Sequence, residues 1–372
     1  MRRALLLALV AVCCLPSPAL ASPPPVHASA YVVQDARTGD VLASYRAHAH
    51  LPIASITKLM TVLVALEHHK LTDVVTADPR AAIVGESTIN LRPHERLTVQ
   101  DLVEGALIQS ANDAAAALAL SVSPDFASFA RLMNAKARAF GLHDSHFVRP
   151  DGLDVPDAYS SAADVTKLGR IAMRNSFVRH TVDEETADIS GGRTLHTWDD
   201  LLSLFPQTFG VKTGHTSQAG WCQVAAARGR GATIYATLLG SPDRNTRNTD
   251  LESLLIWGLA QFRVVPLVQA GRAYATVDLP YGRAPLQLVA ARAQNGAARI
   301  DHGLTEKVVA PVAVSLPVRK GVVLGRVQVW DGKRLVATRD LIASRTVNKP
   351  SAVRRLGWYA GRTLHHLAHL FS

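Results

Sequence analysis

The sequence predicts an α+β protein in which a mixed domain, an antiparallel sheet with a helical region, precedes a small all-β sandwich domain and a C-terminal amphipathic helix. Between about Ser29 and Phe262, strand-like patterns flank a helix-rich middle. From about Arg263 to Ser344, short β-like runs alternate with Gly and Pro, and helical periodicity returns only after Ser351. We therefore divide the chain into residues 1–21, 22–262, 263–344 and 345–372.

The first 21 residues have the pattern of a secretory signal peptide. Met1-Arg2-Arg3 precedes an apolar run from Ala4 to Cys14 that is too short to span a bilayer. The sequence Ala19-Leu20-Ala21 suits cleavage after Ala21. We expect a mature protein that lies outside the cytoplasmic membrane.

The composition indicates which partners to expect. The chain of 372 residues has a formal net charge of +10, which stays strongly positive when Arg2 and Arg3 are removed. A basic surface in this location favours anionic envelope polymers or lipids, and no basic motif interleaved with aromatics points to nucleic acid. Of the three cysteines, only Cys222 remains after cleavage, and its apolar surroundings predict a core thiol rather than a nucleophile.

The first candidate site residues lie at the start of a predicted helix. A hairpin is expected first, with strands at 30–33 and 41–45 and a glycine-containing turn between them. The segment from Ser55 to Glu67 then has apolar residues at helical spacing, so Ser55 and Lys58 are neighbours on one face.

This pair suits nucleophilic catalysis. A serine hydroxyl becomes a good nucleophile when a nearby base accepts its proton, and a lysine can be that base only if its pKa falls toward neutrality. Burial lowers a lysine pKa, and a second cation such as Lys212 would lower it further. The positive potential of a helix N-terminus would also act on the Ser55 oxygen. The alternative is an N-cap serine and an ordinary surface lysine.

The second candidate motif, Ser110-Ala111-Asn112, falls between predicted helices at Leu102–Ile108 and Asp113–Leu120. A simple N-cap of the second helix is one interpretation. In the functional interpretation, the Ser110 hydroxyl relays a proton between Lys58 and the leaving amine, and the Asn112 amide binds the substrate backbone.

The third motif, Lys212-Thr213-Gly214, lies in a predicted strand at Phe209–Thr216 that is followed by a second strand at Trp221–Ala226. An ammonium and a hydroxyl suit an anionic group such as a terminal carboxylate, and Gly214 would let a substrate backbone approach the strand. The alternative is a hairpin strand with an exposed lysine. Taken in order, S-x-x-K, S-x-N and K-T-G predict a serine acyl-transfer site.

The chain resembles the low-molecular-weight penicillin-binding proteins of the D-alanyl-D-alanine carboxypeptidase family. The resemblance is carried by longer strings, which are Pro52 to Thr61, Ser110-Ala111-Asn112-Asp113-Ala114, Met133-Asn134-Ala135-Lys136-Ala137, Gly141-Leu142, His146-Phe147, Asp151-Gly152-Leu153, and Lys212 to Thr216 with Ala219-Gly220. It implies a β-lactamase/transpeptidase-like fold for the catalytic domain and a β-rich C-terminal module.

The resemblance also implies residue roles. Ser55 is the nucleophile, Lys58 the base and Ser110 a further catalytic group, and the implied substrate-binding residues are Asn112, Lys212, Thr213, Gly214 and Arg247. The family arginine that matches Arg247 helps to hold the substrate carboxylate, whereas the alternative is a solvated surface residue. The family's polar N-x-N-like segment is replaced here by Thr197-Trp198-Asp199-Asp200. Neither His68-His69 nor His365-His366 has the companions of a metal site, so we predict no metal and no cofactor.

The implied function is that of a serine D-Ala-D-Ala carboxypeptidase, which acts on peptidoglycan stem peptides through an acyl-enzyme on Ser55 and which β-lactam antibiotics inhibit covalently. A β-lactamase is one alternative, although Arg149 to Ser161 contains no Glu to position a hydrolytic water. A DD-endopeptidase with the same site and a catalytically silent peptidoglycan-binding protein are the others.

In the last third of the chain, the individual elements are predicted from hydrophobic patterns. Strands are expected at Val312–Leu316, Val322–Val329 and Leu335–Leu341. From Val353, a helical projection gathers Leu356, Ala360, Leu364, Leu367 and Phe371 on one side and arginines and histidines on the other. We interpret this helix as an interfacial anchor on an anionic membrane surface, attaching the protein peripherally to the cytoplasmic membrane. A helix docked on its own protein is the alternative.

Overall fold

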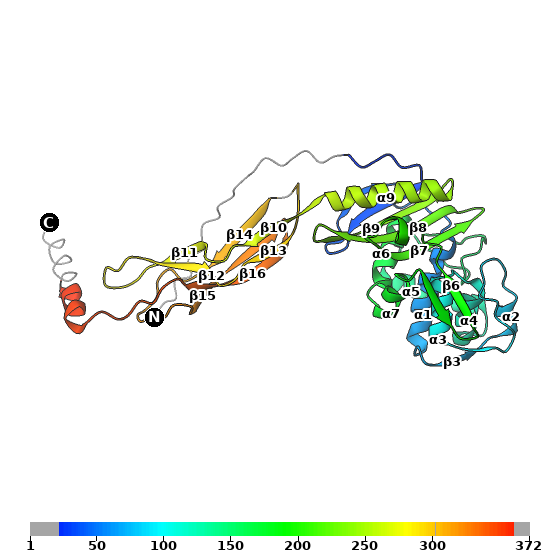
Figure 1. The fold of residues 1–372 in the computed structure, drawn as a ribbon, viewed down its shortest axis with the longest axis horizontal. Coiled ribbons are helices and arrows are strands. Elements are labelled where there is room, and N and C mark those ends of the chain that lie inside the picture. Colours follow the sequence, from blue (N-terminus) through cyan, green and yellow to red (C-terminus); the bar gives the residue numbers. More distant parts are fainter. Residues whose placement is uncertain (1–21, 302, 361–372) are drawn as a thin grey trace. The chain divides into compact units, whose positions relative to one another are not determined.

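The structure, a computed structural model, describes residues 22–301 and 303–360. The chain divides into two compact units, and the division falls between Ala260 and Gln261 (Figure 1). The predicted signal peptide and the last part of the predicted anchor, residues 361–372, lie outside the described residues.

The N-terminal unit is built on a five-stranded sheet with the order β2-β1-β9-β8-β7, in which every neighbouring pair is antiparallel. Its strands are β1 (Ala30–Asp35), β2 (Val41–Tyr45), β7 (Thr208–Thr216), β8 (Gly220–Gly229) and β9 (Ala232–Ser241). The predicted opening hairpin is confirmed as β1 and β2, and the predicted strand pair near the third motif as β7 and β8. Strand β7 is the last in the order, so one of its edges has no strand partner in this sheet.

Two helices cover opposite faces of this sheet (Figure 1). Gly258 of α9 (Arg244–Ala260) lies against Ile234, and a Cβ there would be 2.5 Å from the Ile234 side chain. In α6 (Ala162–Ala172), the Thr166 hydroxyl is 2.7 Å from that of Thr237. Ile234 and Thr237 are three residues apart on β9 and therefore point to opposite faces.

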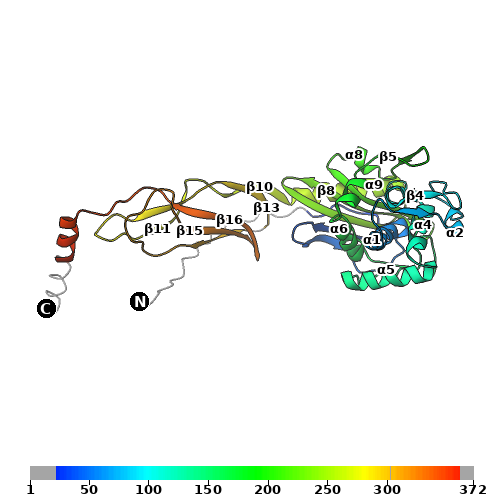
Figure 2. The same cartoon turned by 90° about the horizontal axis from the view of Figure 1, so that it is seen from below.

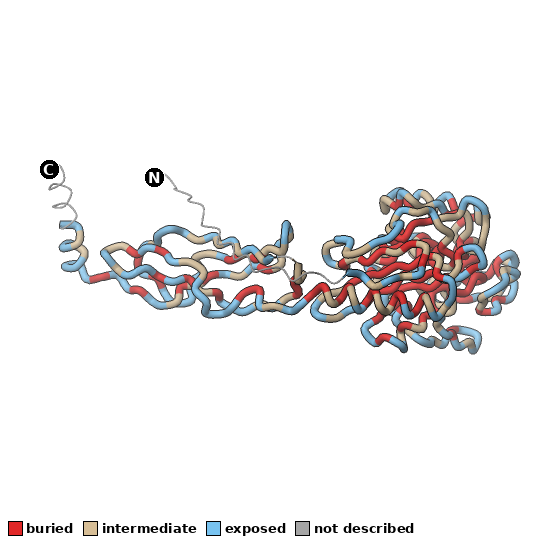
Figure 3. The backbone as a smooth tube through the Cα atoms, turned by 90° about the horizontal axis from the view of Figure 1, so that it is seen from above, coloured by how far each residue is buried: buried red, intermediate tan, exposed pale blue. Residues whose placement is uncertain are grey.

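Four of the remaining helices, α1 (Lys58–His68), α2 (Pro79–Ala82), α3 (Val99–Leu107) and α5 (Phe126–Phe140), pack around α4 (Asn112–Val122). Its alanines from Ala114 to Ala119 are buried, with Leu118 among them. Figure 2 shows α5 at the outer side of this region, and Figure 3 shows how continuous the buried core is. The other elements are η1 (Ala54–Thr57), β3 (Val74–Thr76), β4 (Arg96–Thr98), α7 (Ser176–Thr181), β5 (Thr186–Ile189), β6 (Arg193–His196) and α8 (Leu201–Leu204). The predicted helices at the first two motifs are confirmed, except that Ser55 lies in the short 3-10 turn η1 just before α1.

The C-terminal unit is all-β as far as Ala343, as predicted. It contains a five-stranded sheet with the order β11-β12-β16-β15-β14 and a two-stranded sheet of β10 and β13. The bounds are β10 (Phe262–Val268), β11 (Ala273–Val277), β12 (Leu286–Ala290), β13 (Gln294–Arg299), β14 (Leu304–Val309), β15 (Val323–Asp331) and β16 (Arg334–Ala343).

Two of the three strands predicted for this unit are confirmed as β15 and β16, but the prediction for Val312–Leu316 is wrong. That segment makes only an isolated bridge, between Ala313 and Asp278. It is flanked by Pro311 and Pro317, neither of which can donate a ladder hydrogen bond, and this disfavours a continuous strand.

After the last strand, residues 352–360 are helical. Within the described part of the chain, no helix combines the length and apolar character needed to cross a membrane.

Candidate active site

Ser55 is presented at a sharp turn of the backbone. Ala54, which precedes it, has a left-handed φ of 48°, an uncommon conformation for a residue with a side chain. Two glycines let neighbouring segments approach this turn. A Cβ on Gly152 would lie 2.1 Å from the Ala54 carbonyl oxygen, and one on Gly214 would lie 2.8 Å from the Ile53 carbonyl oxygen. Gly214 is therefore required by the protein's own backbone, whatever it does for a substrate.

Lys58 lies directly beside Ser55. Its ammonium donates to Ser55 Oγ at 2.6 Å, to Asn112 Oδ1 at 2.7 Å and to the Asp151 carbonyl oxygen at 2.8 Å. The side chain is fully buried, and this burial lowers the pKa of Lys58 to about 7, although the negative charges of Asp151, Glu86 and Asp113 act in the opposite direction. At neutral pH much of the amine is uncharged and can accept the Ser55 proton.

The second buried lysine of the site is Lys212. Lys212 Nζ donates to Ser110 Oγ at 2.9 Å and to the Thr213 carbonyl oxygen at 3.0 Å, and its side chain is buried. Burial, and next to it the positive charge of Lys58, hold the pKa of Lys212 well below its usual range. The expected repulsion between the two lysines is thus felt at Lys212, while burial accounts for the low pKa of Lys58.

Ser110 and Asn112 do not cap α4, so the alternative of a simple N-cap is wrong. The N-cap position is Ala111, which makes no side-chain cap hydrogen bond, and Ser110 has a left-handed φ of 60°. Asn112 Nδ2 donates to the Gly85 carbonyl oxygen at 2.9 Å, so its amide joins Lys58 to the loop that follows α2. Asn112 therefore fixes the position of the Lys58 amine.

These residues open into one pocket with a volume of about 170 Å³. Six of the eight predicted site residues line it, and Lys58 and Lys212 lie behind them, bonded to Ser55 and Ser110. The full lining is Ser55, Glu86, Ser87, Ser110, Asn112, Trp198, Thr213, Gly214, His215, Trp221 and Arg247. The structure thus brings all three sequence motifs to one place.

Arg247 comes from the first turn of α9. Its side chain is 1% exposed, so the alternative of a solvated surface residue is wrong. It forms an ion pair with Asp200 at 3.1 Å, and its guanidinium carbon lies 5.5 Å from the centroid of the Trp221 ring. A buried arginine is thereby placed in the wall of the pocket.

The Peptidase_S11 family model, described as D-alanyl-D-alanine carboxypeptidase, matches residues 18–243, which is more than half of the chain. The chain belongs to this family. The D-alanyl-D-alanine carboxypeptidase DacD of Escherichia coli is 29% identical over 371 residues, covering 93% of this chain and 92% of that protein.

Solved structures of relatives agree with the fold. Penicillin-binding protein 5 from Haemophilus influenzae, 27% identical, matches with a TM-score of 0.65 over 88% of this chain and all of that chain. A DD-transpeptidase of Streptomyces, 31% identical, matches with a TM-score of 0.60 over 64% of this chain and 99% of that one. The Streptomyces match covers about as many residues as the N-terminal unit contains.

Several pocket residues lie outside the three motifs and were not predicted. Glu86 and Ser87 reach the pocket through the loop after α2, and Trp198 through the loop before α8. The His215 ring lies against the Trp221 ring, tilted by 31°, with a centroid separation of 4.2 Å. The sequence gave a signal for only two of these places. His215 directly follows the K-T-G motif, and the Thr197–Asp200 segment departs from the family pattern.

Cys222 is confirmed as a core residue. Cys222 is fully buried in the sheet, and burial raises its pKa to about 12, so it is a neutral thiol. Elsewhere in the described residues, no group of three His, Cys, Asp or Glu side chains is arranged to hold a metal ion.

Proposed function

We propose that this protein is a serine D-Ala-D-Ala carboxypeptidase that removes the terminal D-alanine from peptidoglycan stem peptides. The observation that carries the proposal is the 2.6 Å contact between Ser55 Oγ and the buried amine of Lys58, whose pKa is about 7, in the wall of an open pocket. Membership of the carboxypeptidase family supports the same reaction.

In the proposed mechanism, neutral Lys58 accepts the Ser55 proton as Oγ attacks the carbonyl carbon between the two D-alanines. Backbone N–H groups, including that of Ser55, stabilise the oxyanion. Collapse of the tetrahedral intermediate breaks the C–N bond, and the departing amine takes a proton delivered through Ser110. Water then hydrolyses the ester on Ser55 and releases the shortened peptide.

The cationic side of the pocket supports binding of a terminal carboxylate. Arg247 and the Thr213 hydroxyl are the donors that we assign to it, with Lys212 behind them. A bound carboxylate would favour the charged form of Lys212, because an opposite charge raises the pKa of an amine. Penicillins, which present a carboxylate next to a strained amide, would acylate Ser55 in the same way.

Intact-protein mass spectrometry after incubation with a penicillin tests this proposal, with Ser55→Ala as the comparison. We expect a long-lived adduct on the native protein and none on Ser55→Ala. Rapid loss of the adduct with consumption of penicillin would favour a β-lactamase. Absence of any adduct, or an adduct that survives Ser55→Ala, would reject the site and favour the silent binding protein. Digestion of cross-linked and uncross-linked peptides separates endopeptidase from carboxypeptidase action.

We also propose export by the signal peptide and peripheral membrane attachment by the C-terminal helix. In the described part of this helix, Val353 and Leu356 are 84% and 76% exposed, which supports a lipid-facing side. Trp358 and Tyr359 contact Tyr281 edge-on, so the helix also has neighbours in its own unit. Sedimentation with anionic vesicles, compared with a chain ending at Ser351, tests the anchor. Equal sedimentation of both chains would reject it.

A further inference from the structure

The guanidinium of Arg247 is bound along one edge by other residues of the protein. Nε and Nη2 both donate to Asn248 Oδ1, at 3.0 and 2.6 Å, and Nη2 also donates to Asp200 Oδ2 at 3.1 Å. Nη1 has no hydrogen-bond partner among the described residues. Because Arg247 also lines the pocket, Nη1 is the nitrogen that remains for a ligand.

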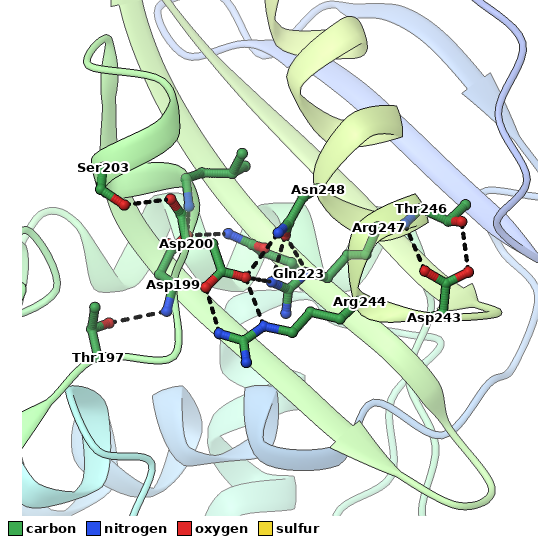
Figure 4. Close-up of polar contacts among 11 residues, drawn as sticks. Thr197, Asp199, Asp200, Ser203, Gln223, Asp243, Arg244, Thr246, Arg247 and Asn248 are labelled. Atoms are coloured by element: carbon green, nitrogen blue, oxygen red, sulfur yellow. Dashed lines mark hydrogen bonds and ion pairs between the residues drawn. The ribbon is translucent and has the colours of Figure 1, made fainter.

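Asp200 is in turn fixed from several directions. Arg244 Nε donates to Asp200 Oδ2 at 2.7 Å, Arg244 Nη2 pairs with Oδ1, and Asn248 Nδ2 donates to Oδ2 at 2.8 Å. Figure 4 shows the Asp200 carboxylate among Arg244, Arg247 and Asn248. Asp200 immediately precedes α8, whereas its three partners lie on α9, so this contact ties two separate elements together.

The charge of Asp200 matters because Arg247 is buried. A buried guanidinium needs a nearby negative charge, and Asn248 supplies only a neutral oxygen. Asp199, whose Oδ1 accepts from Gln223 Nε2 at 2.7 Å, acts on Arg247 through its charge and not through a hydrogen bond. Asp200 is therefore the carboxylate that can set the orientation of the guanidinium.

We propose that Asp200 is a positioning residue for substrate recognition, which together with Asn248 holds Arg247 so that Nη1 can bind the terminal carboxylate of the peptide. This inference rests on the proposed function, in which Arg247 binds that carboxylate. It also gives the Thr197–Asp200 segment, which departs from the family pattern, a part in specificity.

The test compares two donors in the full mature chain: a peptide ending in D-Ala-D-Ala with a free carboxylate, and the same peptide with a C-terminal amide. The ratio of their kcat/KM values is measured for the native protein and for Asp200→Asn. We expect Asp200→Asn to lower the ratio by about tenfold, mainly through a higher KM for the carboxylate donor, because a charge-assisted hydrogen bond is lost. The reaction with the amide donor should stay near that of the native protein.

Asp243→Asn is the matched control. Asp243 also lies beside α9, where its carboxylate accepts from Thr246 N and Thr246 Oγ1 at 2.9 and 2.7 Å (Figure 4). Asparagine caps a helix as well as aspartate, and this carboxylate does not bond the Arg247 guanidinium. The control should therefore leave the ratio unchanged. Asp200→Glu keeps the negative charge, so it should lower the ratio of the two kcat/KM values less than Asp200→Asn does.

Each outcome decides the inference. An equal loss with both donors in Asp200→Asn, or no loss, would overturn the positioning role while leaving acylation of Ser55 and the proposed function intact. A native protein that shows no preference for the carboxylate donor would instead count against the proposed function. If Asp200→Asn does not fold, Asn248→Ala gives the same decision, because it removes the other acceptor for the guanidinium.

Discussion

The two units of this chain bury very different side chains. The N-terminal unit buries three basic side chains, Lys58, Lys212 and Arg247, each no more than 2% exposed. From Gln261 onward, in the described residues, no Lys, Arg, Asp or Glu is buried, and the core consists of apolar side chains such as Leu288 and Val327. Burying charged groups costs folding free energy unless they are paired. The N-terminal unit, which contains the pocket, bears this cost, so it gives up some stability for its chemistry.

The largest effect is expected when the Lys58 amine is removed. Lys58→Met deletes the base, and we expect acylation of Ser55 by penicillin to slow by about a thousandfold. The fold should persist, because removal of a fully desolvated amine offsets the loss of its hydrogen bonds to Asn112 and Asp151. Mass-spectrometric time courses measure the rate, and circular dichroism checks the fold. Lys167→Met, at an exposed site on α6, is the control. A folded Lys58→Met protein that acylates at the native rate would contradict the role of the base.

A second prediction concerns stability in the same unit. Gly152→Ala places a Cβ 2.1 Å from the Ala54 carbonyl oxygen at a φ of +83°, so the backbone ahead of Ser55 must shift. We expect a loss of at least about 2 kcal/mol in the free energy of unfolding. Gly192→Ala, also at positive φ but with nothing within 4 Å of the added Cβ, should cost only about 1 kcal/mol. Urea denaturation measures the free energy of unfolding of both variants. Equal losses would show that the close approach to Ala54 does not add to the cost of Gly152→Ala.

A smaller effect is expected from Glu86. Its negative charge raises the pKa of Lys58, against the larger effect of burial. In Glu86→Gln the Lys58 pKa should fall, so acylation should reach its plateau at a lower pH, by less than about one unit. The pH dependence of the acylation rate measures the shift. Movement to higher pH would contradict the assigned charge interaction.

The smallest effect is expected when the C-terminal unit is deleted. A chain that ends at Ala260 keeps every pocket residue, and the matching Streptomyces structure has a similar extent. We expect its acylation rate by penicillin to stay within about twofold of the native rate, because every residue that lines the pocket belongs to the N-terminal unit. A much larger loss in a folded truncated chain would show that the two units do not act independently.

The sequence predicted the parts of the site whose signals are local. Ser55 and Lys58 are one turn apart, and Lys212 and Thr213 lie in a recognisable strand, so spacing alone placed them correctly. The contacts of Gly152, Trp198 and Asp200 depend on segments far apart in the chain, which no local pattern reveals. In the C-terminal unit the same limit appears at Val312–Leu316, where an apolar run looked like a strand but pairs only through an isolated bridge to Asp278.

The most direct test of the account is the pH dependence of acylation of native Ser55 by a penicillin, followed by mass spectrometry at short times. The base must be uncharged to accept the proton, so the rate should rise with pH through a midpoint at about 7 and then level off. A midpoint near 10, the ordinary value for a lysine, would contradict the claim that burial prepares Lys58 as the base.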